Sequence, residues 1–162
     1  MNRTPFMKIE VGQAAPDFAL YDSAKNIVKL SDLKGQNVLL LFFPLAFTST
    51  CTAELCSIRD NIAFYNNVNA RVFGISVDSL HTLAKYKADQ NLNFSLLSDF
   101  NKEVSSLYGS LYEVFGYNMK GVSKRSAFVI DRDGIIRYEE VLENASEQPS
   151  FKNIALTLEN LK

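Results

Sequence analysis

The sequence predicts an α/β protein with a mixed central sheet flanked by helices. Three uninterrupted apolar runs of strand length alternate along the chain with segments whose apolar residues recur every three or four positions. Strands that are covered on both faces are apolar throughout, whereas a helix that covers a sheet shows a single apolar stripe. This alternation indicates a layered α/β architecture. No repeat or linker divides the chain, so we expect residues 1–162 to form a single domain.

The elements are predicted in the following order. An N-terminal β-hairpin is expected from residues 18–20 and 27–30, which flank a turn-rich segment, and one capped turn follows at residues 31–35. The apolar strands are predicted at residues 38–43, 72–77 and 127–130. The helices are predicted at residues 50–66, 79–90 and 151–161, with Ser79 as a cap. Residues 131–134 form a turn signal that joins the third strand to residues 135–138 in a terminal hairpin.

The composition excludes several functional classes. The net charge of −1 offers no basic surface for nucleic acid. The longest apolar run, residues 38–47, is about half of what a membrane-spanning helix requires, so we expect no membrane partner. Two cysteines are too few for the disulfide framework of a small secreted domain, and the first residues lack a signal-peptide core. These features predict a reducing, cytoplasmic setting.

Cys51 is the first candidate for chemistry. It follows an apolar stretch that ends at Pro44, and it lies at the start of the predicted helix. A helix N-terminus carries roughly half a positive charge and unpaired N–H donors, which favour the nucleophilic thiolate. Cys51 also lies on the apolar stripe of that helix, which fits a small core side chain equally well. The hydroxyls of Thr48 and Ser49 beside it favour a polar site.

The run Pro44-x-x-x-Thr48-x-x-Cys51 resembles the active-site motif of the peroxiredoxins, which are thiol peroxidases on a thioredoxin-like fold. Cys51 matches the peroxidatic cysteine of that motif. Glu54 falls where many members have a glutamate, and Arg125 matches an arginine that precedes a late strand. The resemblance covers essentially the whole chain. It implies reduction of hydrogen peroxide and organic hydroperoxides through a sulfenic acid at Cys51, with no cofactor and no metal.

Ionisation of Cys51 alone cannot account for such an activity. A thiol with a pKa of about 8.5 is a few per cent thiolate at pH 7, so full ionisation gains at most roughly thirtyfold. Enzymes usually need about a million-fold, so other groups must stabilise the charge that develops on the peroxide oxygens. The resemblance implies that the Thr48 hydroxyl, the backbone N–H groups near Thr50 and Cys51, and the Arg125 guanidinium form this polar clamp. Glu54 would orient the arginine.

Cys56 raises a separate question. Its spacing from Cys51 matches the bacterioferritin comigratory protein or peroxiredoxin Q subgroup, which implies that Cys56 resolves the oxidised Cys51 and that thioredoxin or a similar dithiol reduces the disulfide. Five residues of intact helix give a rise of about 7.5 Å and a rotation of about 140°, beyond disulfide geometry, so the helix must first unwind. Residues 44–48 instead resemble the alkyl hydroperoxide reductase E subgroup, which lacks this cysteine, and Thr50 stands where peroxiredoxin Q has glycine. A one-cysteine peroxidase therefore remains an alternative.

Two further functional classes remain open from the sequence. A thioredoxin-like thiol-disulfide oxidoreductase is weakened because the cysteines lack the Cys-x-x-Cys spacing. A redox-sensing interaction protein would use oxidation as a signal. His81, the single histidine, cannot complete a zinc site with two cysteines. Aromatic residues at 108, 112, 115 and 117 suit loop packing, a peroxide channel or a subunit contact. The sequence does not distinguish a monomer from a homodimer.

Overall fold

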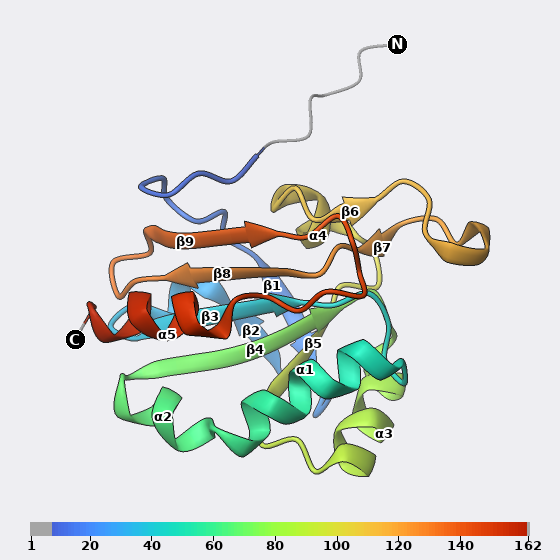
Figure 1. Cartoon of the computed structure of the whole chain (residues 1–162), viewed down its shortest axis with the longest axis horizontal. Coiled ribbons are helices and arrows are strands. Elements are labelled where there is room, and N and C mark those ends of the chain that lie inside the picture. Colours follow the sequence, from blue (N-terminus) through green and yellow to red (C-terminus); the bar gives the residue numbers. More distant parts are fainter. Residues whose placement is uncertain (1–7, 162) are drawn as a thin grey trace.

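The structure, a computed structural model, describes residues 8–161 and is organised around a seven-stranded sheet (Figure 1). The strands are β1 (Ala19–Asp22), β2 (Ile27–Lys29), β3 (Asn37–Phe42), β4 (Ala70–Ser76), β5 (Ser95–Ser98), β6 (Leu111–Tyr112), β7 (Val122–Ser123), β8 (Ser126–Ile130) and β9 (Ile136–Val141). The helices are η1 (Leu30–Leu33), α1 (Ser49–Asp60), α2 (Ile62–Asn67), α3 (Leu80–Gln90), α4 (Glu103–Leu107), η2 (Gly116–Asn118) and α5 (Phe151–Glu159).

The main sheet is mixed, as predicted. Its strand order is β2-β1-β5-β4-β3-β8-β9, and β6 pairs with β7 in a separate small sheet. The three central strands β5, β4 and β3 are parallel, while β1, β8 and β9 run antiparallel to their neighbours. The parallel pairs are joined through helices, since parallel strands need a long crossover connection. The carboxyl ends of β3 and β4 therefore lie at the same edge, where α1 begins.

Strand β3 divides the apolar core into two layers. All six of its residues are buried, and successive side chains point to opposite faces of the sheet. Leu39 and Leu41 face a core that includes α1, α2, α3 and α5, whereas Leu40 and Phe42 face a second core closed by η1, α4 and the N-terminal segment. Figure 1 shows α1 and α5 lying along the sheet on one side. Cys51 belongs to the first of these cores.

The predicted helix over residues 50–66 is in fact two helices. Asn61 leaves helical geometry, with φ −116° and ψ 18°. Its backbone N–H donates to the Ile58 carbonyl at 3.1 Å, and its side chain donates to the Ser57 carbonyl at 2.9 Å. These bonds satisfy carbonyls that the end of a helix leaves unpaired. The apolar stripe continues across the break because Tyr65 on α2 is also buried.

The N-terminal elements also differ in detail from the prediction. The single turn at residues 31–35 is the 3₁₀ helix η1, which begins at Leu30 and has Lys29, not Ser31, at its N-cap position. The hairpin of β1 and β2 is confirmed, but it is part of the main sheet because β1 pairs with β5. The sequence pattern did not predict β5, α4, β6, β7 or η2. Each of these elements has at most five residues, too few to show a clear hydrophobic period.

The remaining predicted elements are confirmed. Ser79 caps α3, and its hydroxyl oxygen accepts a hydrogen bond from the Thr82 backbone N–H. The predicted turn joins β8 to β9, and the last helix buries Ile154 and Leu158. Among residues 8–161, no helix combines the length and the apolar character needed to cross a membrane.

Gly74 on β4 supplies a test of the packing beneath α1. A Cβ atom at this position would lie 2.7 Å from Leu96 Cδ2 and 3.3 Å from Phe43 Cε1, and both side chains are fully buried. We expect Gly74→Ala to lower the free energy of unfolding by roughly 1–3 kcal/mol through overpacking, measured by urea denaturation. Gly116→Ala is the control, because no atom lies within 4 Å of its added Cβ. Equal stability of the two variants would contradict the prediction.

Candidate active site

The loop between β3 and α1 positions Cys51. The Phe43 N–H donates to the Ile75 carbonyl and extends the pairing with β4 by one residue, after which the buried Pro44 leads away from the sheet. The Ala46 N–H donates to Asp78 Oδ2 at 2.8 Å, and Ser76 Oγ donates to the same oxygen at 2.6 Å. The carboxylate of Asp78 thus fixes the middle of the loop to the end of β4.

The same loop contains a strained residue. Phe47 has a φ of +65°, a left-handed conformation that costs a bulky residue free energy and persists only where surrounding contacts enforce it. Its ring, 52% exposed, packs on Tyr86 of α3 with the centroids 4.9 Å apart. The chain therefore turns sharply just before α1 begins. Cys51 is the third residue of α1, among the backbone N–H groups that have no partner within the helix.

Cys51 combines the two interpretations that its sequence position allowed. Its side chain is 1% exposed and packs in the core with Leu55 and Ile58. Arg125, which immediately precedes β8, nevertheless donates from Nη2 to Cys51 Sγ at 3.2 Å. The guanidinium thus presents a positive charge and an N–H donor to the sulfur. The residue is a core side chain with a charged contact.

Glu54 completes a buried triad with Cys51 and Arg125. Glu54 lies one helical turn after Cys51, and its Oε2 accepts a hydrogen bond from Arg125 Nη1 at 2.7 Å. Glu54 and Arg125 are 0% and 1% exposed. The structure therefore brings together three of the predicted site residues, and it places the guanidinium between the sulfur and the carboxylate. The predicted contact between Glu54 and Arg125 is confirmed.

The guanidinium is held from its other side by a backbone carbonyl. Arg125 donates to the Ala145 carbonyl from both Nε, at 3.1 Å, and Nη2, at 2.9 Å. A turn at Asn144, whose Oδ1 accepts from the Ser146 N–H at 3.0 Å, shapes this part of the chain. Neither Ala145 nor Asp78 was predicted from the sequence to belong to the site. No sequence signal identifies Ala145, because its contribution comes from the backbone.

The triad has one positive charge for two acids. Burial raises the pKa of Glu54 to about 7, and the charge and hydrogen bond of Arg125 offset only part of this effect. Burial alone would lower the pKa of Arg125, but the charges of Glu54 and Cys51 raise it above its ordinary value. Oε1 of Glu54 is buried without a hydrogen-bond partner. At neutral pH a large share of Glu54 is therefore protonated in the folded protein.

Thr48 occupies the N-cap position of α1 but makes no capping bond from its side chain. Its exposed hydroxyl donates to the Leu45 carbonyl at 2.8 Å, within the loop that precedes Cys51. The Thr48 carbonyl accepts the first helical bond, from the Thr52 N–H at 3.0 Å. Thr48 therefore lies beside the start of the helix, and in this structure its hydroxyl proton is engaged by the loop.

Cys56 lies on the same helix but not in the triad. Helix α1 is continuous from Ser49 to Asp60, and both cysteines are free thiols. The thiol of Cys56 is half-buried and donates to Gln90 Oε1 at 3.6 Å, so it faces α3. As the helical geometry predicts, a Cys51–Cys56 disulfide requires part of α1 to unwind.

The other candidate residues are placed elsewhere. His81 is exposed in the first turn of α3, and no cluster of three or more metal-ligating side chains occurs within residues 8–161. Tyr108 is fully buried and donates its hydroxyl to the Pro16 carbonyl at 2.7 Å. Tyr112 stacks near Phe115 with centroids 5.2 Å apart, while Tyr117 is 100% exposed.

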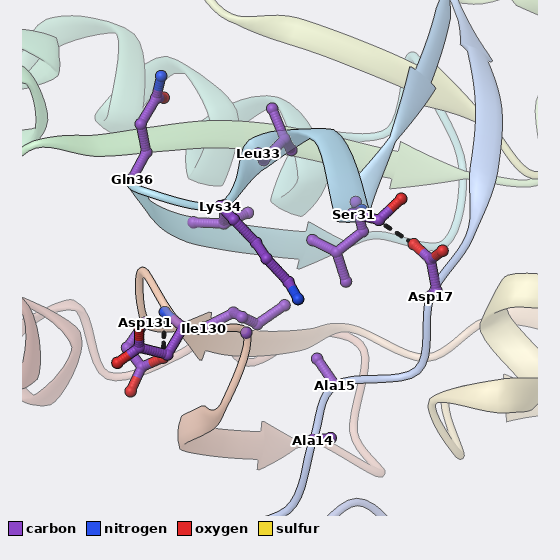
Figure 2. A pocket seen from close by; sticks show the side chains of 13 residues that line it. Ala14, Ala15, Asp17, Ser31, Leu33, Lys34, Gln36, Ile130 and Asp131 are labelled. Carbon is purple, nitrogen blue, oxygen red and sulfur yellow. Dashed lines mark hydrogen bonds between the residues drawn. The ribbon is translucent and has the colours of Figure 1, made fainter.

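A cavity of about 260 Å³ lies at the other end of the sheet (Figure 2). Val38, near the start of β3, and Ile130, at the end of β8, form part of its wall, and Lys34 extends across it. Asp17 Oδ1 accepts a hydrogen bond from the Ser31 N–H at 3.0 Å beside it. The lining includes no member of the triad, so this cavity is separate from the Cys51 site.

A cysteine sulfur, a guanidinium and a helix start form a candidate thiol-based redox site, and comparisons with known proteins indicate the same class of protein. The AhpC/TSA family profile matches residues 11–139. Alkyl hydroperoxide reductase E of Mycobacterium bovis is 40% identical over 136 residues, covering 82% of this chain and 86% of that relative. The crystal structure of peroxidoxin BcpB from Mycobacterium tuberculosis superimposes with a TM-score of 0.83 at 30% identity, covering 95% of this chain and 99% of that chain.

The similarity extends to a reduced 2-Cys peroxiredoxin of Plasmodium vivax, with a TM-score of 0.79, 28% identity, and coverage of 92% of this chain and 80% of that chain. The chain therefore belongs to the AhpC/TSA family and is a peroxiredoxin, a thiol peroxidase. This confirms the predicted family, thioredoxin-like fold and enzyme class. Membership implies a peroxide as the oxidising substrate and a thiol as the reductant.

The raised pKa of Glu54 predicts how stability depends on pH. Its carboxyl has a pKa of about 7 in the folded protein, against an ordinary value of 4.5, so between these values the folded state retains a proton that the unfolded chain has lost. The resulting stabilisation is complete below pH 4.5 and is lost as the pH rises through 7, by on the order of 3 kcal/mol. We expect the Glu54→Gln variant to lose this pH dependence of the free energy of unfolding, measured by urea denaturation at each pH.

Glu113 is exposed, so Glu113→Gln is the matched control and should keep the wild-type dependence of stability on pH. Gln is a neutral isostere of the protonated carboxyl, so the stability of Glu54→Gln should be nearest to that of the wild type at low pH. A wild-type stability that rises between pH 5 and pH 7 would contradict the assignment of the raised pKa to Glu54.

Proposed function

We propose that Cys51 is the peroxidatic nucleophile of this peroxiredoxin. The supporting observation is the hydrogen bond of 3.2 Å from Arg125 Nη2 to Cys51 Sγ in a site closed to bulk water. The Cys51 thiolate attacks the distal oxygen of a peroxide and breaks the O–O bond. The products are the Cys51 sulfenic acid and an alcohol or water, and the leaving oxygen takes up one proton.

The surrounding groups stabilise the transition state of this step. Arg125 carries the positive charge that offsets negative charge on the peroxide oxygens, and the unpaired N–H groups at the start of α1 add further donors. Thr48 would turn its hydroxyl from the Leu45 carbonyl toward the bound peroxide. Glu54 and the Ala145 carbonyl hold the guanidinium in place. Pro44 directs the loop that presents Cys51.

Cys56 resolves the sulfenic acid in the second half of this proposed cycle. The Cys56 thiolate attacks the Cys51 sulfur, the S–S bond forms, and the hydroxyl leaves as water after taking up the proton that Cys56 released. The first turns of α1 must unwind for this step, because the intact helix holds the two sulfurs too far apart. A thioredoxin-like dithiol then reduces the disulfide and is itself oxidised.

A one-cysteine cycle is the alternative that the geometry supports. Helix α1 is unbroken, and Cys56 contacts Gln90 on α3 instead of approaching Cys51. If α1 stays folded during turnover, an external thiol must reduce the sulfenic acid directly. Cys56 is then a half-buried residue of the interface between α1 and α3.

The remaining assignments belong to the same proposal. The substrates are hydrogen peroxide and alkyl hydroperoxides, since the site presents charge and hydrogen-bond donors to the O–O group that both share. Residues 1–162 act as one domain, without a cofactor or a nucleic-acid partner, as a monomer or homodimer in the cytoplasm. The net charge of −1 is consistent with the absence of a polyanionic partner.

Peroxide consumption by cysteine variants tests the cycle. Wild-type protein with a thioredoxin system should reduce hydrogen peroxide catalytically, and Cys51→Ser should lower the rate by at least about a thousandfold because it removes the nucleophile. Cys56→Ser should still consume one equivalent of peroxide but lose recycling by thioredoxin. Mass spectrometry of each protein after one equivalent of peroxide identifies the product.

The product distinguishes the two cycles. An intramolecular disulfide in the wild type, replaced by a sulfenic acid at Cys51 in Cys56→Ser, supports the two-cysteine cycle. A stable sulfenic acid in the wild type contradicts it and supports the one-cysteine cycle. Full activity in Cys51→Ser would overturn the assignment of the nucleophile itself.

A further inference from the structure

The segment that joins β9 to α5 has no regular secondary structure, yet it contributes a group to the active site. This segment, the strap (residues 142–150), follows an edge strand of the sheet, and Figure 1 shows it turning beside β6 and β7 on its way to α5. Residues 143–148 are exposed except for Ala145, which is half-buried. The Ala145 carbonyl accepts hydrogen bonds from Nε and Nη2 of Arg125. The strap therefore contacts the guanidinium through its one partly covered residue.

The Ala145 carbonyl fixes the orientation of the guanidinium. The guanidinium is planar, and Nε and Nη2 lie on one of its edges. Because both nitrogens donate to the same oxygen, this edge points toward the strap as long as the two bonds are kept. Nη2 also donates to Cys51 Sγ at 3.2 Å. A displacement of the carbonyl would therefore move the donor that faces the sulfur.

Few contacts determine the position of this carbonyl. The Leu142 N–H donates to the Arg125 carbonyl at 2.9 Å, just beyond the ends of β8 and β9. One residue further on, the Glu143 carbonyl accepts a hydrogen bond from the Tyr112 hydroxyl at 2.7 Å. Lys124 Nζ lies 2.7 Å from Glu143 Oε1 and 5.6 Å from the centroid of the Tyr112 ring. Tyr112 and Lys124 thus hold the strap two residues before the carbonyl that contacts the guanidinium.

Tyr112 is held in turn by the chain around Arg125. It lies on β6, which pairs with β7 in the small sheet. The Lys124 N–H donates to the Ser110 carbonyl at 2.6 Å, and Ser126 Oγ donates to Ser110 Oγ at 2.9 Å. Ser110 thus binds the residues on both sides of Arg125 and lies two positions before Tyr112. The small sheet and the start of β8 therefore form a common support for the strap.

The Tyr112 hydroxyl is the stronger of the two contacts to Glu143. The Glu143 side chain is 77% exposed, and exposed ion pairs contribute little. The hydroxyl bonds a backbone carbonyl, so it holds the path of the strap itself. Burial is the main cause that raises the pKa of Tyr112, the charge on Glu143 raises it further, and the charge on Arg125 opposes this rise. The hydroxyl therefore keeps its proton at neutral pH and remains a donor.

We propose that Tyr112 is a positioning residue for peroxide reduction. Its hydroxyl holds the strap so that the Ala145 carbonyl keeps the Arg125 guanidinium in place against Cys51. This inference rests on the proposed role of Arg125 in stabilising the transition state. Such stabilisation depends on donors that are already oriented when the O–O bond breaks, so a guanidinium that can rotate away lowers the rate of oxidation.

The test measures the oxidation of Cys51 by itself. Cys56→Ser leaves Cys51 as the single thiol, so the first product is a sulfenic acid whichever proposed cycle operates. After addition of hydrogen peroxide, samples are quenched with an alkylating agent under denaturing conditions, and mass spectrometry follows the loss of the free thiol. In this background we expect Tyr112→Phe to lower the second-order rate constant by about three- to tenfold, the equivalent of one neutral hydrogen bond. The variant keeps the ring and removes the hydroxyl alone.

Two further variants serve as controls. Tyr21→Phe removes the same atom from a tyrosine of β1 that is 54% exposed, and it should keep the parent rate. Glu143→Gln should lower the rate by less than about twofold, because it keeps the backbone carbonyl that Tyr112 binds. Circular dichroism and urea denaturation confirm that each variant is folded. Equal rates in Tyr112→Phe and Tyr21→Phe would overturn the inference, as would an equal loss in Glu143→Gln and Tyr112→Phe.

A double-mutant cycle shows whether Tyr112 acts through Arg125. Arg125→Lys keeps a positive charge but lacks the edge that bonds the Ala145 carbonyl. Tyr112→Phe should therefore change the rate by less than about twofold in the Arg125→Lys background. An equal three- to tenfold loss in both backgrounds would mean that Tyr112 acts by another route, and it would contradict the positioning role.

The outcomes separate this inference from the proposed function. An Arg125→Lys rate equal to that of the parent overturns the proposed role of Arg125 and the present inference with it. A slow Arg125→Lys variant together with an unaffected Tyr112→Phe variant overturns the role of Tyr112 while the proposed function stands.

Discussion

Arg125 carries the single positive charge of a buried site that holds two acids, and the rest of the site depends on how this charge is shared. Its Nη2 donates to Cys51 and its Nη1 to Glu54, at 3.2 Å and 2.7 Å. Burial raises the pKa of Glu54 to about 7, and the charge and hydrogen bond of Arg125 offset only part of this effect. The Cys51 sulfur thereby lies among apolar side chains with a guanidinium beside it.

This constraint explains why several contacts of the fold hold the Arg125 guanidinium in place. Strands β3 and β8 are hydrogen-bonded neighbours, and Cys51 follows one while Arg125 precedes the other. The sheet therefore brings the two residues together although 74 positions separate them in the chain. The Ala145 carbonyl takes two further donors of Arg125, which leaves the guanidinium little freedom to turn away from Cys51. The Asp78 carboxylate likewise holds in place the loop that leads to Cys51.

Helix α1 serves two opposed requirements in the proposed cycle. Folded, it directs N–H donors at Cys51 and packs the sulfur against the core, which suits attack on a peroxide. The same folded helix turns Cys56 toward Gln90 and keeps the two sulfurs apart. Both ends of α1 are held, the start by the bonds of Arg125 to Cys51 and Glu54 and the end by the bond of Arg59 to the Gln90 carbonyl. Unwinding of the first turns must therefore break the bonds of Arg125 to Cys51 and Glu54.

Much of this protein follows from the sequence by itself. The apolar runs predicted β3, β4 and β8, and the apolar stripe predicted α1. The motif with Pro44, Thr48 and Cys51 identified the family. These predictions succeeded because strand burial, helical period and motif spacing are properties of residues that lie close together in the chain. The elements of at most five residues escaped prediction, since so few positions carry no period. Only the tertiary structure decided that Glu54 and Cys51 share one guanidinium, that Ala145 supports it, and that Cys56 contacts Gln90. These contacts depend on how the sheet brings distant segments together. A contact made by a backbone carbonyl cannot be predicted from residue type, because every residue has a backbone carbonyl.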